Sequence, residues 1–137
     1  MFLVQLIYAS KVSDMFLPGD VESILESARN NNKALGITGM LCFNSTYFLQ
    51  CLEGSRAAVN KIFNTISADS RHESMLILAY SEIYKRDFGD WDMGYVSESK
   101  LKRKLMLKYA STDIFNPFSM QGESALNLLS DLKSELS

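Results

Sequence analysis

The feature that most constrains the fold is the order in which two apolar spacings follow one another along the chain. Apolar residues recur at helical spacing in two segments, around residues 21–28 and 59–66. Five other runs have the length and composition typical of β-strands, at residues 2–9, 37–43, 47–53, 75–84 and 93–96. The order β-α-β-β-α-β with one further strand predicts an α+β, ferredoxin-like fold, in which two helices cover one face of a mostly antiparallel sheet.

Short polar sequences mark the ends of the two helices. The Pro-Gly-Asp sequence at residues 18–20 supplies a turn and a start for the first helix. The polar run at residues 29–32 predicts that this helix ends there, ahead of Gly36. Ser55 is placed to cap the start of the second helix.

The C-terminal residues 98–137 are predicted to form a helical extension to a domain at residues 1–97. Residues 101–107 favour a helix, Asn116 and Pro117 interrupt it, and a second, amphipathic helix follows. Because an apolar stripe must be covered, we expect both helices to pack on the open face of the sheet and to favour a homo-oligomer. The stripe consists of Ala125, Leu128, Leu129, Leu132 and Leu136.

Charge and cysteine content exclude several classes of function. With a net charge of −2 and no long basic run, the chain lacks the electrostatic surface that binds nucleic acid or an anionic membrane. Its N-terminal apolar run is short and has no positive flank, so it is neither a signal peptide nor a membrane span. Cys42 and Cys51 lack the spacing of a metal site, and we expect reduced core thiols in a cytoplasmic protein without bound metal.

Gln50 is the most informative single residue, because it interrupts the apolar run at residues 47–52. An unpaired buried amide costs about 1–3 kcal/mol, so Gln50 must bond either to neighbouring backbone or to a polar ligand. Tyr8 closes the first strand on the face of Val4 and Leu6, a position that also suits an ordinary core tyrosine with its hydroxyl at the rim.

Further polar residues follow each of the two helices, and each alone fits an ordinary helix end or loop. The predicted topology, however, gathers them around one groove between the helices, with a planar, amide-rich ring as a suitable ligand. They are Asn31 and Asn32, then Asp69, Arg71 and His72, with Ile24, Leu25 and Ile66 as apolar walls.

Five stretches of the sequence resemble the BLUF family of blue-light receptors. They are LIYAS at 6–10, ESARNNNKALGITGMLCF at 26–43, YFLQCLEG at 47–54, DSRH at 69–72 and RDFGDWDMGY at 86–95. They cover about residues 1–97 in the family's order, and the tail, including LMLKYAS, resembles the extension of short, stand-alone (PixD-like) members. The resemblance implies a non-covalently bound flavin between the two helices, normally FAD, with FMN or riboflavin as alternatives.

The resemblance also implies residue roles. Tyr8 matches a redox-active tyrosine, Gln50 the amide between it and the ring, and Asn32 the residue at the ring's polar edge. Two positions depart from some members: Ala28 replaces a serine and Thr65 replaces a basic residue, which weakens the expected hold on the phosphates. By the same resemblance, Asn31 lies beside Asn32, Asp69, Arg71 and His72 match residues near the ribityl chain and phosphates, and Trp91 and Met93 match a pair whose placement near Gln50 is debated. We further expect Ile24, Leu25, Phe48 and Ile66 to surround the ring. Because Trp91 and Met93 lie in the segment that leads into the last strand and the C-terminal helices, we predict that they relay the signal.

The implied function is blue-light sensing without substrate turnover. Tyr8 would yield an electron and a proton, Gln50 would rearrange its hydrogen bonds, the flavin bands would shift to the red, and the signal would pass by contact to a downstream protein. Two alternatives are a flavin-free ferredoxin-like interaction module and a small acyl-phosphate hydrolase. The hydrolase needs an arginine in the first strand-to-helix loop, where residues 9–19 contain only Lys11.

Overall fold

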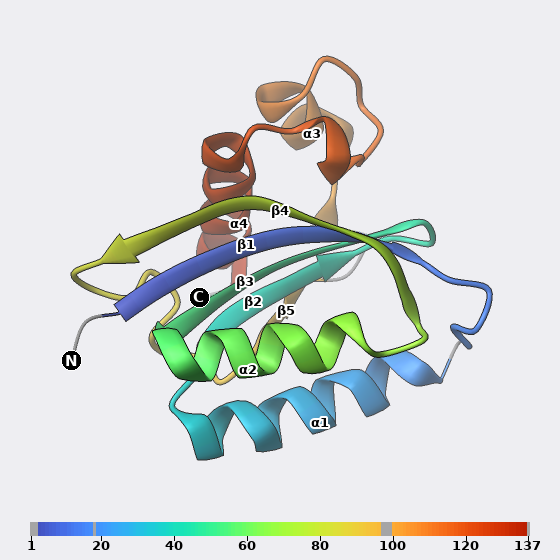
Figure 1. Ribbon diagram of the computed structural model, residues 1–137. Coiled ribbons are helices and arrows are strands. Elements are labelled where there is room, and N and C mark those ends of the chain that lie inside the picture. The colour runs from blue at the N-terminus through green and yellow to red at the C-terminus, as the bar shows by residue number, and fades with distance from the viewer. Residues whose placement is uncertain (1–2, 18, 97–99, 137) are drawn as a thin grey trace.

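The computed structural model describes residues 3–17, 19–96 and 100–136. It has the predicted α+β architecture, a five-stranded mixed sheet with helices on both faces (Figure 1). Phe2 of the predicted first strand, Pro18 of the predicted turn and the predicted boundary between residues 97 and 98 lie outside the described residues.

The sheet has the strand order β4-β1-β3-β2-β5. The first four strands pair antiparallel, and β5 pairs parallel to β2, so the predicted ferredoxin-like sheet with one added strand is confirmed. The β2–β3 hairpin closes through Asn44, whose Oδ1 accepts the backbone N–H groups of Thr46 and Tyr47. The strands are β1 (Leu3–Val12), β2 (Thr38–Phe43), β3 (Tyr47–Ser55), β4 (His72–Ile83) and β5 (Gly94–Val96).

Two helices lie side by side on one face of the sheet, and the C-terminal helices cover the other (Figure 1). The second helix begins as predicted, because Ser55 Oγ accepts the backbone N–H of Ala58. The helices are α1 (Asp20–Leu35), α2 (Arg56–Ser67), α3 (Arg103–Tyr109) and α4 (Gly122–Leu136), with a short 3-10 helix, η2 (Pro117–Ser119), ahead of α4.

Alternate residues of each strand belong to two separate cores, because successive side chains of a strand point to opposite faces. Val4, Leu6 and Tyr8 pack beneath α1 and α2, whereas Ile7 and Cys51 pack beneath the C-terminal helices. The predicted covering of the open face by an apolar stripe is thereby confirmed. Its fully buried members are Ala125, Leu128, Leu129 and Leu132, while the side chain of Leu136 lies outside the described residues.

The predicted end of the first helix is wrong by one turn. The helix continues through Leu35 and stops at Gly36, whose φ of 69° lets the N–H of Ile37 bond to the carbonyl of Asn32. Asn32 is tolerated in the last turn because its side chain donates a hydrogen bond to the carbonyl of Asp92. Asn31 and Asn32 therefore both lie within α1 and not beyond its end.

Among the described residues, no helix is long and apolar enough to cross a membrane, and no group of three or more His, Cys, Asp or Glu side chains is placed to hold a metal ion.

Candidate functional site

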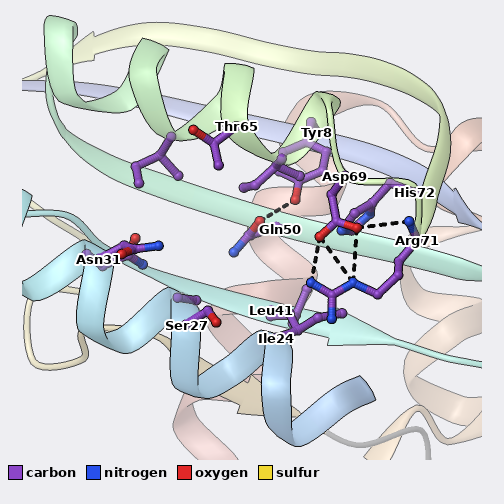
Figure 2. Close-up of a pocket in the computed structure, with 14 residues that line it drawn as sticks. Tyr8, Ile24, Ser27, Asn31, Leu41, Gln50, Thr65, Asp69, Arg71 and His72 are labelled. Atoms are coloured by element: carbon purple, nitrogen blue, oxygen red, sulfur yellow. Dashed lines mark hydrogen bonds and ion pairs between the residues drawn. The ribbon is translucent and has the colours of Figure 1, made fainter. Parts of the chain in front are cut away.

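A pocket of about 620 Å³, counting its open mouth, lies between α1 and α2 with the sheet as its floor (Figure 2). Its lining combines an amide-rich floor, apolar walls and a charged end. The lining residues are Tyr8, Ile24, Ser27, Ala28, Asn31, Asn32, Leu41, Gln50, Ile62, Thr65, Ile66, Asp69, Arg71 and His72.

Tyr8 and Gln50 lie directly opposite each other on β1 and β3, and both point into the pocket. The Tyr8 hydroxyl donates a hydrogen bond to Gln50 Oε1, and Gln50 Nε2 in turn lies 3.3 Å from the sulfur of Met93. Burial, with a smaller contribution from the Asp69 carboxylate, raises the pKa of Tyr8 far above its ordinary value. The phenol therefore holds its proton at neutral pH and presents it to the amide.

Asn32 is the second buried amide of the site, at 1% exposure. Its Nδ2 donates to the carbonyl of Asp92 at 2.9 Å. Its Oδ1 has no hydrogen-bond partner within the described part of the chain, although it is buried. Because an unpaired buried acceptor is unfavourable, Asn32 Oδ1 is suited to receive an N–H group from a molecule in the pocket.

The far end of the pocket carries an ion pair (Figure 2). Arg71 Nη2 lies 2.6 Å from Asp69 Oδ2, and Nε donates to both carboxylate oxygens at 3.0 and 3.1 Å. This hydrogen bonding lowers the pKa of Asp69. His72 lies beside the pair, with Nδ1 2.8 Å from Ser10 Oγ, and burial lowers its pKa to about 4. His72 is therefore neutral at physiological pH.

The structure brings together all the residues predicted around the ring except Leu25 and Phe48. Leu25 packs in the core beneath α1, and the ring of Phe48 packs against His72 with 4.4 Å between ring centroids. Both lie behind the pocket wall and outside its lining.

Five lining residues were not predicted as site residues: Ser27, Ala28, Leu41, Ile62 and Thr65. Ser27 and Ala28 precede Asn31 and Asn32 by one helical turn, and Leu41 lies opposite Gln50 in the β2–β3 ladder. The helical spacing would have identified Ser27 and Ala28 once Asn31 and Asn32 were chosen, and the predicted hairpin would have placed Leu41 near Gln50. Ala28 and Thr65 were noted in the sequence only as departures from some family members.

The two residues predicted as a signal relay lie on opposite faces of the sheet. Met93 is 2% exposed and belongs to the core beneath α1 and α2, beside Gln50. Trp91 packs against the core beneath the C-terminal helices, with Lys133 Nζ 5.7 Å from its ring centroid. The structure thus brings Met93, and not Trp91, to the amide.

Residues 3–94 match the family BLUF, described as sensors of blue-light using FAD. Among curated proteins, the chain is 33% identical over 93 residues to the photoactivated adenylate cyclase subunit beta of Euglena gracilis, covering 66% of this chain and 11% of the relative. It is 33% identical over 87 residues to the blue light- and temperature-regulated antirepressor BluF of Escherichia coli (strain K12), covering 64% of this chain and 22% of that protein. The chain thus spans about a tenth to a fifth of these relatives.

Two solved structures are similar over almost their whole length. The photo-activated state of BlsA has a TM-score of 0.85 and 31% sequence identity, covering 95% of this chain and 94% of BlsA. The dark-state structure of BlrB, a BLUF protein, has a TM-score of 0.79 and 32% identity, covering 99% of this chain and 98% of BlrB. The C-terminal helices, which lie outside the family match, are therefore shared with both.

Proposed function

The chain belongs to the BLUF family of flavin-binding blue-light sensors, and from this premise we propose that Tyr8 and Gln50 are its photoactive pair. The observation that carries the proposal is the hydrogen bond from the Tyr8 hydroxyl to Gln50 Oε1 at the floor of the pocket. Family membership sets aside the hydrolase and the flavin-free module. FAD is the flavin we expect, as in the family description.

The residues of the pocket fit a flavin ring. The ring has flat apolar faces, and one edge carries an N–H group between two carbonyls. Ile24 and Ile66 supply apolar walls from α1 and α2, and Asn32 Oδ1 supplies a buried acceptor that lacks a donor within the described residues. Asn31 and Gln50 add amide groups that can donate to carbonyls.

When bound, the flavin absorbs blue light and, once excited, accepts an electron from a nearby donor. Tyr8 would be that donor, and its hydroxyl proton would pass along the existing hydrogen bond to Gln50. Because Tyr8 would regain its electron and proton, the cycle would consume nothing and would form no covalent bond between the flavin and the protein. Gln50 is left with its donor and acceptor ends exchanged between partners, in a new orientation or tautomer.

The signal leaves the pocket through the connection between β4 and β5. Met93, at the end of this connection, accepts a hydrogen bond from the Gln50 amide. Trp91, two residues earlier, packs against the core beneath the C-terminal helices. Lys133 of α4 donates to the carbonyl of Asp87 at 2.5 Å, so the connection is bonded to α4 as well as packed against it. We infer that a change in the hydrogen bonds of Gln50 alters the contacts between the connection and α4. A downstream protein or a second copy of the chain would then bind the altered surface of α4.

Spectra of purified variants before and after blue light test the pair. Tyr8→Phe is expected to bind flavin and lose the normal red shift, because neither the phenol proton nor its electron is available. Gln50→Ala is expected to lose it as well. Tyr80→Phe is the matched control, since Tyr80 is 44% exposed and outside the pocket lining. A normal photocycle in Tyr8→Phe or Gln50→Ala would show that the assigned role is wrong.

A second experiment tests the relay. Met93→Ala is expected to keep most of the red shift but to weaken the light-dependent difference in limited proteolysis and size-exclusion chromatography. Met15→Ala, at an exposed methionine outside the pocket lining, is the control. If Met93→Ala reproduces the full light-dependent difference of the parent, the signal leaves by another route.

A further inference from the structure

The exposed apolar side chains of the protein are concentrated at one edge of the sheet. Of the eight large apolar side chains that are exposed among the described residues, four lie between residues 76 and 84. They are Leu76, Ile77, Tyr80 and Tyr84, each at least 41% exposed. The first three belong to β4, the edge strand whose one neighbour in the described sheet is β1 (Figure 1). The outer side of β4 therefore presents backbone N–H and C=O groups without a strand partner in the described part of the chain.

The two edges of the sheet differ in how they are protected. β5, at the opposite edge, has only three residues, and Arg29 Nε donates to the carbonyl of Met93 immediately before it. β4 has twelve residues and contains no lysine, arginine or proline. Lysine and proline are the residues that most often keep an exposed edge strand from pairing. The edge at β4 is therefore suited to accept a further strand.

The apolar stripe of α4 is used within the chain and leaves little for a partner. Its members Ala125, Leu128, Leu129 and Leu132 are fully buried in the core between α4 and the sheet. A second copy of the chain cannot reach them unless α4 leaves the sheet. β4 and the residue that follows it closely thus carry half of the exposed large apolar side chains that remain for self-association.

Two exposed charges near the ends of β4 have no partner within the described chain. Glu73 lies at the start of the strand, and Lys85 follows its end by two residues. Neither takes part in an ion pair among the described residues. Glu82, by contrast, lies 2.8 Å from Arg56 of α2. Glu73 and Lys85 are therefore available to charges of opposite sign on another molecule.

The spacing of these charges suits antiparallel pairing of β4 with β4 of a second copy. Because β4 has two register irregularities against β1, positions along it are measured by the β1 residues that it faces. Glu73, Leu76 and Ile83 face β1 residues 11, 9 and 3, and Lys85 follows Ile83 by two residues. A two-fold axis at the level of β1 residue 6 therefore places Glu73 of one copy opposite Lys85 of the other, and Leu76 opposite Ile83.

We propose that this protein self-associates by antiparallel pairing of β4 with β4 of a second copy, which joins the two five-stranded sheets into one. The two Glu73–Lys85 ion pairs set the register, and the Leu76–Ile83 contacts bury apolar surface. A strand edge is a small interface, so we expect a weak dimer with a Kd of roughly 50 μM. The proposal does not depend on the flavin site.

Sedimentation velocity of the purified protein with its bound flavin, in darkness and at low salt, tests this pairing. We expect a monomer–dimer equilibrium over a concentration range of about 5 to 500 μM. Glu73→Lys and Lys85→Glu are each expected to raise the Kd roughly fivefold, because each change places like charges opposite one another at both ends of the interface. The double variant E73K/K85E restores both pairs with reversed polarity and should return the Kd to within about twofold of the parent value. Glu26→Lys, the same charge reversal at an exposed position on α1, is the matched control.

An edge lysine supplies an independent test. Leu76→Lys removes an apolar contact and places a charge on the paired edge, so we expect the Kd to rise at least about tenfold. Leu107→Lys, at a leucine of similar exposure on α3, should leave the Kd unchanged.

A parent protein that remains monomeric at the highest concentration would overturn the proposal. So would a dimer whose Kd is the same in both single charge variants, or one that the double variant fails to restore, because the interface would then lie elsewhere or have another register. Glu73 and Lys85 are exposed, so the charge variants decide the question even if Leu76→Lys does not fold. Sedimentation reports mass and absorbance reports flavin, so failure of the dimer and failure of the flavin site are distinguished.

Discussion

Two buried amides, Gln50 and Asn32, differ in how completely they are bonded. Gln50 uses both ends, accepting from Tyr8 and donating to Met93. Asn32 uses only its Nδ2, toward the carbonyl of Asp92, and its Oδ1 is buried without a partner in the described residues. A fully bonded amide can exchange partners, whereas a half-bonded one is ready to receive a ligand. The structure therefore supports a switching role for Gln50 and a binding role for Asn32.

The binding role of Asn32 predicts a specific loss of affinity. Asn32→Ala removes the buried acceptor, and we expect flavin affinity to fall roughly tenfold, the value of one buried hydrogen bond of about 1.4 kcal/mol. The flavin that remains bound should still respond to light, because Tyr8 and Gln50 are intact. Flavin fluorescence titration measures the affinity. Asn60→Ala, at an exposed position on α2, is the control. Equal affinities in the parent and Asn32→Ala would remove Asn32 from the site.

Single residues were predictable where a polar group interrupts an apolar run, as at Gln50. They were not predictable where either of two nearby residues could have pointed into the pocket. Leu25 lies one residue from Ile24, which is a rotation of about 100° around the helix, so spacing alone did not show which of the two would reach the pocket. Phe48 shares the strand face of Gln50 but lies two residues along it, about 6.6 Å away and beyond the pocket wall.

At the scale of elements, the connection between β4 and β5 is held by hydrogen bonds at both ends. At its start, the fully buried carboxylate of Glu53 accepts the backbone N–H groups of Asp87 and Phe88, each at 2.9 Å. At its end, Arg29 Nε donates to the carbonyl of Met93 at 3.3 Å, and Asn32 holds the preceding residue. A segment held in this way can transmit a small displacement, because its ends do not move freely.

The contact between this connection and α4 predicts an effect of Lys133. Its Nζ donates to the carbonyl of Asp87 and lies 5.8 and 5.7 Å from the ring centroids of Phe88 and Trp91. Lys133→Met keeps the aliphatic stem but removes the charge and the hydrogen bond. We expect an unchanged red shift and a light-dependent change in α4 proteolysis at most half that of the parent.

Lys108→Met is the matched control for this experiment, because Lys108 of α3 forms its ion pair with Asp131 of α4. If Lys133→Met and the parent show the same light-dependent proteolysis, Lys133 does not couple the connection to α4.

The order of the helices and strands was predictable from the sequence, whereas their ends and the long-range hydrogen bonds between them were not. The strands and helices followed from two distinct periodicities. The end of α1 was misplaced because asparagines usually stop a helix, and only the folded partner of Asn32, the carbonyl of Asp92, explains its place inside one. The hydrogen bonds to Glu53 join residues more than 30 positions apart in sequence, and local sequence patterns do not predict such contacts.

At the scale of the whole molecule, the sheet separates the core that borders the pocket from a core under the C-terminal helices. His72 lies on the ligand side and is the only histidine of the chain. Its ordinary pKa of 6.5 falls to about 4 in the folded protein because of burial. Between these two pH values the unfolded chain binds a proton that the folded protein does not, so acidification favours unfolding.

We therefore expect the free energy of unfolding to fall by up to about 3 kcal/mol as the pH is lowered from 6.5 to 4. Urea unfolding at a fixed flavin concentration, repeated across this range, measures the slope. His72→Gln should be less dependent on pH over the same range, because no other side chain of the chain has an ordinary pKa between 5 and 8. Parallel curves for the parent and His72→Gln would contradict a depressed pKa at this position.

The most direct test of light sensing by hydrogen-bond exchange is the absorption spectrum of the purified protein before, during and after blue light. We predict a yellow protein whose flavin bands shift to the red without bleaching and return in darkness. This follows from the proposal that the hydrogen-bonded Tyr8–Gln50 pair changes its hydrogen bonds and forms no covalent bond to the flavin. A protein that remains colourless with added FAD, FMN and riboflavin would contradict flavin binding. Bound flavin whose bands bleach, or do not move at all, would contradict the exchange at Gln50.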